Sequence, residues 1–182
     1  AVRSNVLVKN RLIETSKLTL AADNAGFSLT GKGKFDGVPF DGSYRQPVGP
    51  GAAPGKLRGQ VTLTPDALGK FGISLPQGTV SGKGTGEIDM TIARGVAPSL
   101  SLRSNLVGLR IAVPQVSWTK PASKAGKLEV AATLGPVPSV ERLEISGPGL
   151  AASGSVRFTQ DKLLDRLRFN QVKVGNWLDV PL

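Results

Sequence analysis

The stretch Ile88-Asp89-Met90-Thr91-Ile92 alternates large apolar and polar side chains without interruption. Because successive side chains of a β-strand point to opposite faces, this stretch predicts a strand with one apolar face and one polar face. The same two-residue period recurs further along the chain, at residues 100–103 (LSLR), 109–113 (LRIAV), 128–132 (LEVAA) and 143–146 (LEIS). Turn-forming Gly, Pro, Asn and Asp clusters separate such segments. The chain is therefore predicted to be all-β.

The N-terminal third has the same pattern, with strands expected at residues 6–8, 18–22, 27–35, 38–44 and 56–63. We expect about a dozen strands in all, at the spacing typical of all-β folds. Long parallel crossovers are absent, which predicts an antiparallel meander. Its apolar faces would fill the core of a sandwich if they close on one another.

Two local signals place the connections. Asp36-Gly37, between Phe35 and Val38, is a candidate for a tight hairpin turn. Residues 46–55 (QPVGPGAAPG) are predicted to form the longest loop, but the strands on its two sides show the same kind of alternation. We therefore expect a single all-β domain over residues 1–182.

One short helix is expected near residues 65–71. Thr64 is placed as its N-cap, Pro65 takes the first helical position, and Gly72 can end it. Leu68 and Phe71 lie three residues apart, so both can pack on the sheet. A weaker helical pattern spans residues 161–168, where we instead expect a turn that leads into a strand over residues 167–174.

The chain contains no cysteine and no histidine. This composition excludes disulfides, thiolate metal sites, Cys nucleophiles and every Ser-His arrangement, and it removes the commonest general base and metal ligand. The 13 carboxylates are scattered along the chain. We therefore expect no enzyme, with no catalytic residue, no metal site and no cofactor.

Three apparent motifs have simpler explanations. Gly26 and Gly31-Lys32 match half of a phosphate-binding loop, but Gly33 stands where a metal-binding Ser or Thr is needed and no helix follows. Glu87 and Asp89 share one strand face and are expected to be solvated. The glycines at residues 82, 84 and 86 leave one strand face bare, which predicts close packing of the backbone or a bend.

The formal net charge of +10 favours anionic partners in general. Aromatic residues make up only 5% of the chain and occupy strand positions that favour burial, so a nucleic-acid partner is not expected. Lys120, Lys124 and Lys127 bracket a loop that contains Pro and Gly. They are candidates for contact with anionic headgroups, although lysines at sheet edges also prevent edge-to-edge aggregation.

The chain begins without Met, has no signal peptide, and contains no apolar run near the roughly 20 residues that span a bilayer. We expect it to be part of a longer protein whose anchor or export signal lies elsewhere. Open sheet edges at its two ends would then allow the isolated segment to self-associate.

Four stretches in order resemble bacterial envelope proteins of the AsmA, TamB and YhdP superfamily, YhdP-like proteins above all. They are residues 31–40 (GKGKFDGVPF), 63–72 (LTPDALGKFG), 109–121 (LRIAVPQVSWTKP) and 143–154 (LEISGPGLAASG). The resemblance covers residues 27–182, as a middle segment, and the motif Trp118-Thr119-Lys120-Pro121 is its most specific part.

The resemblance implies that the meander forms a curved, trough-like sheet with an apolar inside. It also implies a periplasmic segment of a protein that is anchored in the inner membrane and carries phospholipid between the inner and outer membranes in this trough. It implies a phospholipid or another membrane lipid, and neighbouring segments of the same full-length chain, as partners. The family has no catalytic motif. The apolar strand positions are then candidates to line the groove: Val80, Ile88, Met90, Ile92, Leu100, Leu102, Leu109, Ile111, Val113, Leu128, Val130, Leu143, Ile145, Val156, Phe158, Leu167 and Phe169.

The alternative is a structural or partner-binding β-domain of the cell envelope, with a closed core and a basic surface. The same alternation is typical of a buried core, so these residues fit both interpretations.

Overall fold

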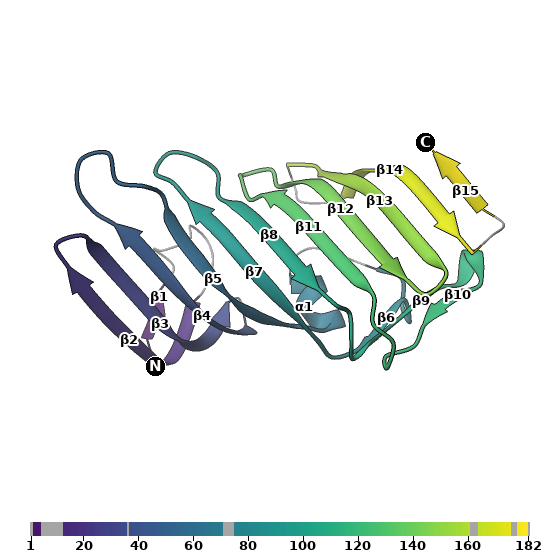
Figure 1. The fold of residues 1–182 in the computed structure, drawn as a ribbon, viewed down its shortest axis with the longest axis horizontal. Helices are drawn as coiled ribbons and strands as arrows, with labels where there is room; N and C mark the ends of the chain where they lie inside the picture. The colour runs from purple at the N-terminus through teal and green to yellow at the C-terminus, as the bar shows by residue number, and fades with distance from the viewer. Residues whose placement is uncertain are drawn as a thin grey trace.

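A computed structural model describes residues 2–4, 13–35, 37–70, 75–160, 164–175 and 178–181. The protein is mostly antiparallel β-structure with one short α-helix, as the sequence predicts (Figure 1). The strand expected at residues 6–8 lies outside the described residues.

Twelve strands form one large sheet. They are β1 (Val2–Ser4), β2 (Ile13–Asp23), β3 (Gly26–Phe35), β4 (Val38–Pro47), β5 (Gly55–Leu63), β7 (Gly84–Ile92), β8 (Ser99–Ser104), β11 (Lys127–Thr133), β12 (Ser139–Gly147), β13 (Leu150–Phe158), β14 (Leu164–Val174) and β15 (Leu178–Pro181). Their order in the sheet is their order in the chain, and all neighbours are antiparallel. The predicted meander is therefore confirmed, and β1 and β15 are its two edges.

The meander is interrupted twice. The chain leaves the large sheet after β5 to form α1 (Pro65–Lys70) and β6 (Val80–Gly82). It leaves again after β8 to form β9 (Leu109–Val113), a 3-10 turn (Pro114–Val116) and β10 (Trp118–Lys120). These strands pair with one another in a second sheet of order β10-β9-β6. Figure 1 shows α1 and the second sheet at one end of the long strands.

The local signals act as predicted where the structure describes them. Phe35 pairs directly with Val38, so the β3–β4 connection is the tight hairpin expected from the sequence, and Gly37 has a φ of +77°. Asp36 itself lies outside the described residues. The loop between β4 and β5 also falls within the predicted range, and residues 164–174 form a strand rather than a helix.

The helix α1 begins with the predicted cap. The Thr64 hydroxyl accepts a hydrogen bond from the Ala67 backbone N–H at 3.1 Å, which satisfies one of the free donors of the first turn. Ala67 is the buried residue of the helix, and Leu68 is half-buried. Phe71 and Gly72 lie outside the described residues.

The main core lies between the two sheets. It consists of Leu63, Leu106, Leu109, Ile111, Trp118, Leu150 and Val174. These residues come from both sheets and from the loop before β9. The second sheet thus covers the large sheet at the end where β5 finishes and β13 begins.

The glycines at residues 82–86 serve the junction of the two sheets. Gly82 has a φ of +93° and ends β6, and the next residue, Lys83, donates its N–H to the Gly108 carbonyl at 3.1 Å. A Cβ at Gly84 would lie 2.9 Å from Cγ of Leu109, and one at Gly86 would lie 2.7 Å from Cδ1 of Leu102. Of the two predicted alternatives, close packing is confirmed.

Candidate functional site

The register of the large sheet gathers apolar residues on one of its faces, which we call the apolar face, and charged residues on the other, the polar face. In β7, for example, Ile88, Met90 and Ile92 lie on the apolar face, and Glu87 and Asp89 lie on the polar face. This segregation continues across the sheet, because the register shifts between β2 and β3 and between β11, β12, β13 and β14 leave the apolar residues before and after each shift on the same face.

A row of directly paired apolar residues crosses ten strands of the apolar face, from β2 to β14. It consists of Leu20, Leu29, Tyr44, Leu57, Met90, Leu100, Ala132, Val140, Val156 and Leu167. We call it the apolar row. At about 4.8 Å from strand to strand, it runs for roughly 43 Å across the sheet.

The apolar row lies toward the strand ends that the second sheet leaves uncovered. Its terminal members are the most open, with Leu20 63% exposed and Leu167 43% exposed. Only Met90 and Ala132 are buried, and the other six members are half-buried. Burial raises the pKa of the Tyr44 hydroxyl, which donates a hydrogen bond to Oε1 of Gln46 at 2.6 Å.

Next to the apolar row, three glycines pair with one another across the sheet: Gly31 of β3, Gly42 of β4 and Gly59 of β5. A Cβ at Gly42 would collide with the carbonyl oxygen of Arg58 on the neighbouring strand, and Gly31 and Gly59 have equivalent neighbours. Glycines of this kind allow a sheet to bend. Figure 1 shows the sheet turning back at this end, so that β1 lies behind β3 and β4.

Thirteen of the residues predicted to line a groove lie on the apolar face of the large sheet: Ile88, Met90, Ile92, Leu100, Leu102, Leu128, Val130, Leu143, Ile145, Val156, Phe158, Leu167 and Phe169. The register therefore brings them together on one surface.

The other four predicted lining residues lie elsewhere. Val80 belongs to β6, and Leu109, Ile111 and Val113 belong to β9, so all four are part of the second sheet. Leu109 and Ile111 are core residues, 4% and 6% exposed, and Val80 and Val113 pack against that core. Their assignment to an open groove is therefore corrected, because they face the large sheet across the core.

The apolar row includes residues that the sequence-based list omits. Leu20, Leu29, Tyr44 and Leu57 bring the N-terminal strands into the same surface as Met90. The strands predicted at residues 18–22, 27–35, 38–44 and 56–63 contain these four positions. The pairing itself depends on register, which the alternation does not give.

The prediction that Lys120 contacts anionic headgroups is wrong. Its side chain is fully buried, and its ammonium donates hydrogen bonds to the carbonyl oxygens of Leu106, Leu109 and Pro121 at 2.7, 2.8 and 3.1 Å. Burial lowers the pKa of this ammonium. The three carbonyls use all of its donors, so Lys120 ties β10 to the turn before β9 and does not reach the surface.

The other two predicted headgroup contacts are exposed, in different settings. Lys124 lies in the turn after Pro121. Lys127 lies on the polar face, where its ammonium is 3.3 Å from a carboxylate oxygen of Glu129 and 3.6 Å from one of Glu144. Neither lysine therefore adjoins the open part of the apolar row.

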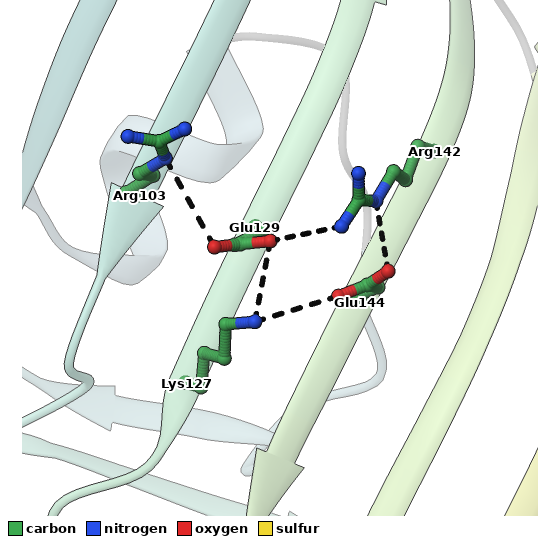
Figure 2. A network of polar contacts seen from close by, with 5 residues as sticks. All are labelled: Arg103, Lys127, Glu129, Arg142 and Glu144. Carbon is green, nitrogen blue, oxygen red and sulfur yellow. Dashed lines mark hydrogen bonds and ion pairs between the residues drawn. The ribbon is translucent and has the colours of Figure 1, made fainter.

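A network of five charged residues connects β8, β11 and β12 on the polar face (Figure 2). Glu129 lies at its centre and contacts Arg103, Lys127 and Arg142. The Arg142 Nε also donates a hydrogen bond to Glu144 at 2.8 Å, which lowers the pKa of the Glu144 carboxyl and raises that of the guanidinium. Since these side chains lie on a face exposed to solvent, each ion pair contributes little to the stability of the fold.

Within the described residues, no group of three or more acidic side chains is placed to hold a metal ion. No helix among these residues is long and apolar enough to cross a membrane. Comparison with protein-family models, with curated proteins and with solved structures finds no match to this chain.

Proposed function

We propose that the apolar face carries the acyl chains of phospholipid, and that the chain is a segment of a periplasmic bridge-like lipid-transfer protein. The observation that supports this proposal is the apolar row. It extends over ten paired strands and stays partly open along most of its length.

The row suits an acyl chain for two physical reasons. Contact with apolar side chains removes hydrocarbon from water, which favours binding by about 25 cal/mol for each Å² that is buried. The row also runs from strand to strand, so a lipid can pass along it without crossing a polar side of the sheet. Movement then needs no chemical step, and the proposal includes neither an enzyme activity nor a cofactor.

The resemblance to YhdP-like proteins supplies the rest of the proposal. The parent protein is anchored in the inner membrane and exposed to the periplasm, and neighbouring segments of the same chain extend the groove. The transported ligand is a phospholipid or another membrane lipid, carried between the inner and outer membranes.

A second candidate is a structural or partner-binding β-domain with a closed core and a basic surface. Two observations favour it: the packed core between the two sheets, and the burial of Met90 and Ala132 in the middle of the apolar row. In that case the exposed ends of the row are surface positions with no ligand.

Native mass spectrometry of the purified chain, with organic extraction of whatever remains bound, separates the two candidates. The lipid proposal expects phospholipid adducts on the folded protein. A protein that stays free of lipid after incubation with phospholipid vesicles would contradict it and favour the closed β-domain.

Matched substitutions on the two faces test the position of the site. We expect Leu100→Glu and Leu20→Glu to reduce binding of a fluorescent phospholipid strongly, because each places a charge in the apolar row. Ser99→Glu and Thr19→Glu add the same charge to the adjacent residue on the polar face, and they should leave binding unchanged. Thermal unfolding of all four variants controls for loss of folding, and equal binding by all four would refute the assignment.

A further inference from the structure

Three loops along one edge of the large sheet are almost free of polar side chains. They connect β4 to β5 (residues 48–54, VGPGAAP), β7 to β8 (residues 93–98, ARGVAP) and β11 to β12 (residues 134–138, LGPVP). Arg94 is their only polar side chain, and every other residue is Gly, Pro, Ala, Val or Leu. Loops commonly contain Asn, Asp and Ser, whose side chains hydrogen-bond to the backbone. We call these three loops the apolar rim.

The apolar rim follows one edge of the sheet. The six strands that it connects are neighbours, in the order β4-β5-β7-β8-β11-β12. All three loops therefore lie at the same ends of the strands, the ends that the second sheet leaves uncovered, and Figure 1 shows them along the upper edge. Each loop is two strands from the next, which is a distance of about 10 Å.

Each loop of the apolar rim exposes one valine. Val48 is 49% exposed, Val96 is 65% exposed and Val137 is 43% exposed. A single exposed apolar residue is common at a protein surface, but here one stands on each of three adjacent loops. This repetition indicates an apolar partner that contacts the whole edge.

Next to the apolar rim, a row of directly paired side chains on the polar face contains no carboxylate. From β4 to β12 its members are Arg45, Lys56, Thr91, Ser99, Thr133 and Ser139. Arg45 and Lys56 are exposed and lie opposite each other, and no described carboxylate forms an ion pair with either of them or with Arg94. Glu141, near the far end of the row, accepts a hydrogen bond from the Ser139 hydroxyl at 2.6 Å. The edge thus combines apolar tips with positive charge.

An open pocket of about 440 Å³ lies between the first two loops. It is lined by Gln46, residues 52–54 and residues 92–94. Arg94 is its only charged lining residue. A guanidinium group can bind two phosphate oxygens at once through its N–H donors. A phosphate group can therefore lie against Arg94 while the hydrocarbon beside it contacts the alanine side chains of the loops.

We propose that the apolar rim docks on the surface of a bilayer that contains anionic phospholipid. The three valines insert between the headgroups, where the hydrocarbon begins, and Arg45, Lys56 and Arg94 contact phosphate groups. Removal of the valines from water supplies one part of the binding, and attraction to the negative surface potential supplies the other. The proposal does not depend on carriage of lipid along the apolar row.

The chemistry of the edge favours a lipid surface over other partners. Specific protein interfaces concentrate their binding free energy in Trp, Tyr and Arg side chains that fill pockets, whereas the tips of the rim are valines on separate loops. A nucleic acid would bind the cations but would leave the valines without a contact, since its bases stack on aromatic rings. A second copy of this edge would bring positive charge against positive charge.

Flotation of the 182-residue chain with phospholipid vesicles measures the docking. We expect the chain to bind vesicles made of phosphatidylglycerol and phosphatidylcholine in equal parts, and to bind phosphatidylcholine vesicles at least about tenfold more weakly. High salt should weaken the binding, because it screens the exposed cations. Absence of binding to the mixed vesicles, or equal binding to both kinds, would overturn the proposal.

Removal of two valines tests the tips. Val48→Asn/Val96→Asn should lower the partition coefficient for the mixed vesicles about tenfold, because two aliphatic side chains no longer leave water. The control Leu75→Asn/Val107→Asn changes two residues that are 45% and 44% exposed but lie outside the apolar rim, and it should bind like the unmodified chain. Circular dichroism shows whether the variants fold. Equal binding by the two folded variants would refute insertion of the tips.

Neutralisation of the three cations tests the second half of the site. Arg45→Gln/Lys56→Gln/Arg94→Gln should weaken binding to the mixed vesicles at least about tenfold. The control Lys83→Gln/Arg110→Gln/Lys124→Gln removes the same net charge from exposed positions outside the apolar rim, and it should retain most of the binding. If the control loses as much, the attraction is one of net charge and the rim is not the docking edge. If the cations matter and the valines do not, the edge binds anions through charge alone, and a bilayer surface is refuted.

Discussion

The ammonium nitrogen of Lys120 lies 2.7 Å from the carbonyl oxygen of Leu106, fourteen residues earlier in the chain, and donates a hydrogen bond to it. Leu106 has a φ of +56°, a left-handed conformation that costs free energy for a residue with a Cβ, and it is almost fully buried. The contact therefore holds a strained turn at the point where the chain passes from β8 to the second sheet.

Replacement of Lys120 by Met should lower the free energy of unfolding by about 2 kcal/mol, because carbonyl oxygens in the interior lose their hydrogen-bond donor. Urea denaturation followed by fluorescence of the tryptophans gives this value. The control Lys124→Met removes an exposed lysine in the next turn and should change stability by less than about 0.5 kcal/mol. Equal effects of the two substitutions would contradict a structural role for Lys120.

Ile111→Asp should prevent folding or destabilise the protein by more than about 3 kcal/mol, because it places a carboxylate in the core between the sheets. Val130→Asp should cost clearly less, because Val130 is only half-buried on the apolar face. Circular dichroism and soluble yield of the two variants make the comparison. A folded, soluble Ile111→Asp protein would show that the second sheet does not pack as described.

Gly42→Ala should destabilise the protein by about 1–3 kcal/mol, since the added Cβ collides with the Arg58 carbonyl and forces the strands apart. Gly69→Ala is the control, because a Cβ at Gly69 meets no atom within 4 Å and alanine favours the helix. Thermal unfolding should therefore shift down for the first variant, and up or not at all for the second. A neutral Gly42→Ala would mean that the strands can separate freely there.

The charge network of the polar face should contribute a stability term that depends on pH. The hydrogen bond from Arg142 lowers the pKa of Glu144 below 4.5 in the folded protein, so the unfolded chain takes up this proton first as the pH falls. The stabilisation is present above pH 4.5 and is lost as the pH falls through the lowered pKa.

Denaturation at a series of acidic pH values tests this sign. Glu144→Gln should show a shallower loss of stability below pH 4.5 than the unmodified chain. If Glu144→Gln has an unchanged slope, the ion pair with Arg142 does not persist in solution.

The strands, the hairpin at Gly37 and the cap at Thr64 were predictable because each depends on neighbours in the sequence. The separate second sheet was not, because Leu109-Arg110-Ile111 alternates in the same way as Leu100-Ser101-Leu102. Only the partner strand decides which sheet each joins. The alternation therefore predicts a strand and its two faces, but not its layer.

The same limit applies to the candidate site. Lys120 and Lys127 flank the same loop in the sequence, yet one is buried under three carbonyls and the other faces solvent. The difference arises because β9 and its preceding turn close over Lys120. The apolar row was likewise predictable strand by strand, whereas its continuity depends on pairing, including the register shifts between β11, β12 and β13.

The two interruptions of the meander leave its pairing intact, since β5 pairs with β7 and β8 pairs with β11 as if the intervening segments were absent. The second sheet is thus topologically dispensable to the large one. Both segments of the cover are insertions between strands that are already neighbours, so their length can change without reordering any strand. The extent of the open surface is then set by these two insertions, and the pairing of the strands beneath them is independent of it.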